Sequence, residues 1–113
     1  MNVRHRRLHT SIAWAVAAAF SSLAFAESEP TNLINQQHCM FCHTVDAPFL
    51  APSFHQIADR YRGKPLAGET LERKLRLGGK AHWGDTPMPP PSERGGPLSQ
   101  QDAHVLVDWV LSQ

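Results

Sequence analysis

The sequence contains only two cysteines, and they stand three positions apart, at Cys39 and Cys42. It has no second cysteine-rich segment of the kind that completes a four-ligand zinc site. It also lacks an excess of positive charge, since 11 Lys and Arg stand against 10 Asp and Glu. This balance excludes the basic footprint of a nucleic-acid-binding protein. No run of residues has the pattern of a strand, and 113 residues allow one domain at most.

The first 26 residues have the pattern of a cleaved export signal. An apolar, alanine-rich run at 11–26 ends in Ala24-Phe25-Ala26, which fits the A-x-A pattern of signal-peptidase sites. The basic residues that precede this run are Arg4, Arg6 and Arg7. The run is shorter than the roughly 20 residues that span a bilayer, which favours cleavage before Glu27 over an uncleaved membrane anchor.

The predicted mature chain, 27–113, is small. Loss of three arginines leaves eight basic residues against ten acidic ones, a formal charge of −2. A domain of this size usually needs a staple such as a metal or a disulfide to supplement its core. A buried cofactor with a large apolar surface serves the same purpose.

Both cysteines belong to the stretch Cys39-Met40-Phe41-Cys42-His43. The spacing C-x-x-C-H is typical of covalent attachment of a c-type haem, with two thioethers to the porphyrin and the histidine as an axial ligand of the iron. A redox-active disulfide is the first alternative, but such pairs stand beside a βαβ pattern that the sequence does not show. Zinc is the second, and the motif offers it only three crowded ligands.

The pattern of the mature chain predicts an all-α domain of four helices around one haem. The helices are expected at about 31–37, at 53–61, at 69–77 and from 99 onward. Ser53 with Gln56 forms a capping-box pattern, and Ser99 is the predicted N-cap of the last helix. Segment 44–52 is predicted to be an apolar loop. Segment 80–97, with five prolines, has almost no potential for helix or strand.

An electron-transfer haem needs a second strong axial ligand, Met or His. Of three methionines, Met1 leaves with the export signal and Met40 is held between the two cysteines, which leaves Met88. Met88 lies in the sequence Thr86-Pro87-Met88-Pro89-Pro90-Pro91, where prolines stiffen the backbone and lower the ordering cost of ligation. We refer to this segment, 86–91, as the strap. His82, close to the strap in the sequence, is the alternative ligand.

The mature chain resembles the small bacterial class I cytochromes c of the c-551 type over nearly its whole length. The residues that carry the resemblance are Cys39-x-x-Cys42-His43, Ala51-Pro52, the stretch from Trp83 to Pro90, and Trp109 to Gln113. The resemblance implies that the Pro52 carbonyl orients His43 and that the Trp83 indole donates to a haem propionate. Pro91 stands where relatives commonly have an Asn near the Met ligand, and the loop 92–96 is longer than in the nearest relatives.

The expected function is electron transfer, not enzyme catalysis. The chain is predicted to be a monomeric periplasmic carrier that docks transiently at the haem edge on redox partner proteins. Because haem c is attached to an unfolded chain outside the cytoplasm, Sec export is expected in place of the twin-arginine route that Arg6-Arg7 suggests. The alternative is a haem subunit of an enzyme complex, or a ligand-binding or peroxidatic haem protein whose Met ligand is displaced.

Overall fold

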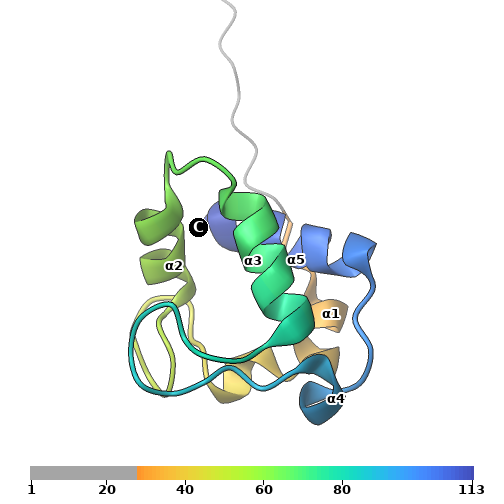
Figure 1. Ribbon diagram of the computed structural model, residues 1–113. Helices are drawn as coiled ribbons and strands as arrows, with labels where there is room; N and C mark the ends of the chain where they lie inside the picture. Colours follow the sequence, from red (N-terminus) through yellow and green to blue (C-terminus); the bar gives the residue numbers. More distant parts are fainter. Residues whose placement is uncertain (1–27) are drawn as a thin grey trace, which may run out of the picture.

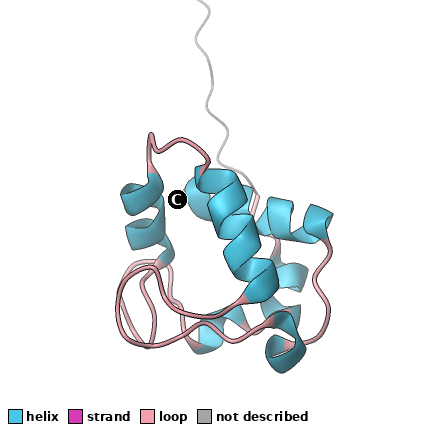
Figure 2. Ribbon diagram, viewed as in Figure 1, coloured by secondary structure: helices cyan, strands magenta, loops and turns pink. Residues whose placement is uncertain are grey.

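The computed structural model describes residues 28–113 and contains only helices and loops in this part of the chain (Figure 2). The predicted export signal at 1–26 lies outside the described residues. The elements are α1 (Thr31–Gln36), the 3-10 helix η1 (Cys39–Phe41), α2 (Phe54–Tyr61), α3 (Ala67–Leu77), α4 (Pro91–Arg94) and α5 (Gln100–Leu111). The all-α prediction is confirmed.

The C-terminal helix α5 organises the core. It packs against both α2 and α3, and it runs behind α3 in Figure 1. The rings of Phe54 from α2 and Trp109 from α5 meet edge to face, with centroids 4.9 Å apart. Burial of such large apolar side chains is the main stabilising term in a small domain. The buried cluster comprises Ile34, Phe54, Leu98, Ala103, Leu106 and Trp109.

The local signals for helix starts are confirmed at two positions. The Ser53 hydroxyl accepts from the Gln56 amide at 3.1 Å, and the Gln56 side chain accepts from the Ser53 amide at 2.9 Å. The hydroxyl of Ser99 accepts from the Asp102 amide at 3.0 Å. Each of these bonds satisfies a backbone N–H that the first helical turn leaves without a partner.

Two predicted helix boundaries are wrong by a few residues. The first helix ends at Gln36, because His38 adopts a left-handed φ of 51° that turns the chain into η1. The third helix begins at Ala67, two residues earlier than expected, after Leu66 in a left-handed conformation. Gly68 therefore lies in its first turn, where its low helix propensity is tolerated.

The proline-rich segment 80–97 contains more structure than predicted. Pro91 to Arg94 form the short helix α4, since proline at the first helical position already has the required φ. An isolated antiparallel bridge joins Gly79 to Met88. Among residues 28–113, no helix combines the length and the apolar character needed to cross a membrane.

Candidate haem site

A cavity of about 500 Å³ occupies the space between the helices and the two long loops. Its volume falls within the range of about 300–1,000 Å³ that holds organic ligands. The structure brings together here all the residues predicted to bind the cofactor: Cys39, Cys42, His43, Pro52, Trp83 and Met88. Most of the other residues along its wall are apolar, including Phe54, Ile57, Leu71 and Leu106.

The His43 ring is held in one tautomer. Its Nδ1 lies 2.7 Å from the carbonyl oxygen of Pro52, and a carbonyl can only accept, so Nδ1 carries the proton. This leaves the lone pair of Nε2 for a metal. The ring stacks on Phe54 with centroids 5.3 Å apart. Burial lowers the pKa of His43, the Pro52 hydrogen bond opposes that shift, and the Arg94 charge adds to it, so the neutral ligand form is favoured.

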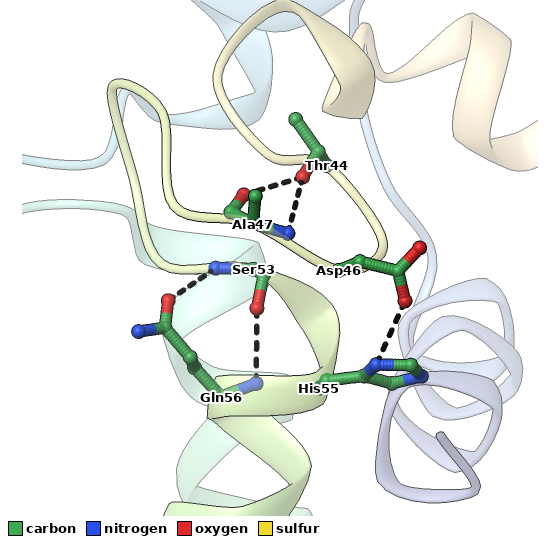
Figure 3. A network of polar contacts seen from close by, with 6 residues as sticks. All are labelled: Thr44, Asp46, Ala47, Ser53, His55 and Gln56. Carbon is green, nitrogen blue, oxygen red and sulfur yellow. Dashed lines mark hydrogen bonds and ion pairs between the residues drawn. The ribbon is translucent and has the colours of Figure 1, made fainter.

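Polar contacts before and after Pro52 in the sequence tie the preceding loop to the start of α2, and Figure 3 shows them. Directly after Pro52, the capping box of Ser53 and Gln56 secures the first turn of α2. Asp46, in the preceding loop, pairs with His55 of α2 at 3.0 Å. These contacts hold the loop and the helix start together, and they thereby set the direction of the carbonyl that orients His43.

Cys39 is the first residue of η1, and Cys42 directly follows its last residue. The amides of Cys42 and His43 both donate to the Cys39 carbonyl, at 3.3 and 3.0 Å, so one tight turn carries all three side chains. Burial raises the pKa of Cys39, with Arg94 opposing, so the thiol form is favoured. The cysteines are not joined in a disulfide. Nor do three His, Cys, Asp or Glu side chains gather as a metal-ion site anywhere in 28–113.

Met88 is positioned by the end of α3. The Gly79 amide donates to the Met88 carbonyl at 2.7 Å, and the Met88 amide donates to the Gly79 carbonyl at 2.9 Å. Gly78 lies so close to the strap that a Cβ there would come within 2.7 Å of the Met88 carbonyl oxygen. The sequence shows the two glycines as a helix end, but not their contact with the strap.

Arg94 is a site residue that the sequence did not predict. It is only 8% exposed and lines the cavity from α4. Its Nε donates to the Pro89 carbonyl at 2.8 Å, and its Nη2 donates to the Leu75 carbonyl of α3. The guanidinium therefore links α3 to the residue that follows Met88. The sequence signal was weak, because an arginine in a polar loop is usually exposed.

Trp83 and His82 lie at the part of the cavity nearest α2. The Arg60 guanidinium lies 4.4 Å from the centroid of the Trp83 ring. The Tyr61 hydroxyl shares a hydrogen bond with His82 Nδ1. Burial lowers the pKa of His82, and the charges of Lys74 and Arg60 lower it further. His82 thus lines the cavity with Met88, but its ring is tied to α2 through Tyr61.

The residues around the cavity fit haem c. Two thiols on one turn offer the covalent anchors, and a neutral imidazole with a fixed tautomer offers an axial nitrogen. The volume suits a large organic ring and far exceeds what a single metal ion needs. A helical domain with these groups around one cavity defines a small haem protein.

Comparison with known proteins agrees with this class. The family model described as cytochrome c matches residues 31–113. Cytochrome c-551 of Azotobacter vinelandii is 35% identical over 81 residues, covering 72% of this chain and 93% of that protein. Cytochrome c-551 of Allochromatium vinosum is 34% identical over 95 residues, covering 82% of this chain and 97% of that protein. The crystal structure of Nitrosomonas europaea cytochrome c552 superposes with a TM-score of 0.63 at 33% identity, covering 72% of this chain and 95% of that one.

The chain therefore belongs to the cytochrome c family, as a class I cytochrome of the c-551/c-552 type. Family membership and the Cys39–Cys42 pair give it one covalent haem c and the role of an electron carrier.

Proposed function

We propose that the protein is a periplasmic electron carrier whose haem c is attached through Cys39 and Cys42 and ligated axially by His43 and Met88. When bound, haem c supplies a one-electron couple between ferric and ferrous iron. The observation that carries the proposal is the convergence on one cavity of a tautomer-fixed His43 and a Met88 whose backbone is bonded to Gly79.

The protein residues contribute orientation and exclusion of water. The Pro52 carbonyl fixes the His43 ring, and the bridge to Gly79 fixes the backbone of Met88. A sulfur held in place before and after electron transfer keeps structural change small. Trp83 lines the cavity with Lys74, and its indole N–H would donate to a haem propionate.

Redox partners dock where apolar side chains surround the cavity. Phe41, Phe49 and Leu50 line the cavity, and in this role they form its apolar rim. Apolar groups on this rim allow close approach to the cofactor edge. The contact belongs to the small, short-lived class of redox interfaces that bury less than about 1,200 Å².

The export signal, cleaved before Glu27, delivers the 27–113 domain to the periplasm. Mass spectrometry of the purified protein tests that boundary.

The ligand set is tested with carbon monoxide and with two variants. Pyridine haemochrome analysis of the wild type should report covalent haem c, and ferrous wild-type protein should resist carbon monoxide at neutral pH. Met88→Ala should keep covalent haem but become high-spin and bind carbon monoxide, while His82→Ala, the matched control, should behave as wild type. Rapid carbon monoxide binding by the wild type would refute an electron carrier in which protein side chains supply both axial ligands. An unchanged Met88→Ala spectrum, with loss of the low-spin spectrum in His82→Ala, would assign the ligand to His82.

A further inference from the structure

Arg94 is an unusual charge for the interior of a small domain. It is 8% exposed, and its two described hydrogen bonds go to backbone carbonyls, those of Pro89 and Leu75. The ion pairs formed within residues 28–113 do not include it. Its Nη1 is buried and has no hydrogen-bond partner in that part of the chain. Within residues 28–113, the guanidinium is thus desolvated and its hydrogen-bond acceptors are neutral carbonyls only.

Such burial is costly. Removing a cation from water carries a penalty that a carboxylate partner usually offsets in part, and two carbonyl dipoles offset it less. Burial lowers the pKa of Arg94, yet a guanidinium remains charged at neutral pH. Tying α3 to the strap requires hydrogen-bond donors, which a neutral side chain can also supply. The charge itself is therefore not explained by the two hydrogen bonds.

The position of the charge suggests what it does. Arg94 lines the cavity together with Cys39, His43 and Met88. A fixed cation in a region of low dielectric constant favours whichever state of a neighbour carries less positive charge.

We propose that Arg94 is an internal cation of the haem cavity that shifts the iron equilibrium toward the ferrous state. Reduction adds one electron, delivered by a reduced partner protein, and lowers the charge of the iron by one, while Arg94 keeps its proton throughout. Arg94 is a positioning residue for the strap through its hydrogen bonds, and a tuning residue through its charge. The inference rests on the proposed electron-carrier function and does not depend on which residue is the sixth ligand.

The test compares reduction potentials of the wild type with Arg94→Met and Arg94→Lys. Coulomb's law, at an effective dielectric constant near 20 and a separation on the order of 10 Å, gives an effect of roughly tenfold on the equilibrium constant. Arg94→Met should therefore lower the equilibrium constant for reduction roughly tenfold, about 59 mV for a one-electron couple. Arg94→Lys, which keeps the charge but not the planar fork, should stay within roughly twofold of wild type. Arg76 is exposed on α3, and Arg76→Met makes the same change in net charge. This substitution should shift the equilibrium constant for reduction far less, because water and salt screen the charge of Arg76.

Absorption spectra separate the possible failures. If the variants keep the wild-type spectrum and Arg94→Met keeps the wild-type potential, the inference is overturned while the proposed function stands. Equal shifts in Arg94→Met and Arg94→Lys would show that only the hydrogen bonds matter, which also overturns it. If Arg94→Met loses the sixth ligand, Arg94→Gln, whose amide can still donate to a carbonyl, replaces it in the comparison. A wild type without a low-spin haem c spectrum would instead refute the proposed function.

Discussion

Replacing Gly78 with alanine tests whether the end of α3 holds the strap that carries Met88. Gly78 has a φ of +64° and a ψ of −145°, a backbone region that is nearly restricted to glycine and that costs other residues about 1–3 kcal/mol. Its added Cβ would lie 2.7 Å from the Met88 carbonyl oxygen, 2.7 Å from the Pro90 nitrogen and 2.8 Å from the Pro89 carbonyl carbon. All three are backbone atoms, so the strap must move by roughly 0.7 Å to reach the 3.4 Å at which ordinary contact begins. Overpacking of this kind adds about 1–3 kcal/mol.

Gly79→Ala is the matched control. Gly79 also has a positive φ, of +91°, but a Cβ there meets no atom within 4 Å. Gly79→Ala should therefore lose only about 1–2 kcal/mol of unfolding free energy. Gly78→Ala should lose about 2–6 kcal/mol, from its backbone conformation and the overpacking together. Both are measured by guanidinium denaturation of the haem-loaded protein.

The displacement of the strap in Gly78→Ala should also weaken the bond between Met88 and the iron. Titration of the ferric protein with imidazole should show at least tenfold tighter binding in Gly78→Ala than in Gly79→Ala, since about 1.4 kcal/mol of strap strain corresponds to tenfold in affinity. Equal imidazole affinities and equal stabilities in the two variants would refute the reasoning.

Three further predictions follow from contacts around the site. Ser53→Ala removes the capping box at the start of α2 and should cost about 1 kcal/mol in guanidinium denaturation, with no loss of covalent haem. Gly95→Ala should destabilise more than a helix cap does, because a Cβ there would overlap the Gln36 carbonyl oxygen; an unchanged denaturation midpoint would contradict this packing. The hydrogen bond that His104 donates to the Glu72 carboxylate, followed by the charge of Asp108, raises the pKa of His104. The stability that His104 gains from this pairing should be complete below the ordinary histidine pKa near 6.5 and lost as pH rises through the folded value. The difference in midpoint between wild type and Glu72→Gln should accordingly be larger at pH 6 than at pH 8.

Local signals in the sequence were sufficient for two helix starts, those of α2 and α5. Ser53 and Ser99 cap helices through bonds to residues three positions away, and such bonds depend on little beyond the chain itself. The C-x-x-C-H spacing and the proline-flanked Met88 were informative for a similar reason, since both restrict chemistry within a few residues. The position of Met88 in the wall of the cavity agrees with that interpretation.

Contacts between distant segments were not predictable in this way. The burial of Arg94 depends on carbonyls at positions 75 and 89, which only the folded chain brings together. The closeness of Gly78 to the strap likewise depends on the tertiary path of segment 80–90. Two adjacent glycines at one helix end, where one suffices as a cap, were the available sign that a second chain segment passes there.

The methionine methyl resonances of the reduced protein test the central claim, Met88 ligation, most directly. With ¹³C-labelled methionine methyl groups, the mature chain should give one signal from Met40 and one from Met88. If Met88 is the ligand, one methyl signal should be strongly shifted upfield by the ring current of the haem, and Met88→Leu should abolish this signal alone. Two unshifted methyl signals in the wild type, or a shifted signal that survives Met88→Leu, would contradict it.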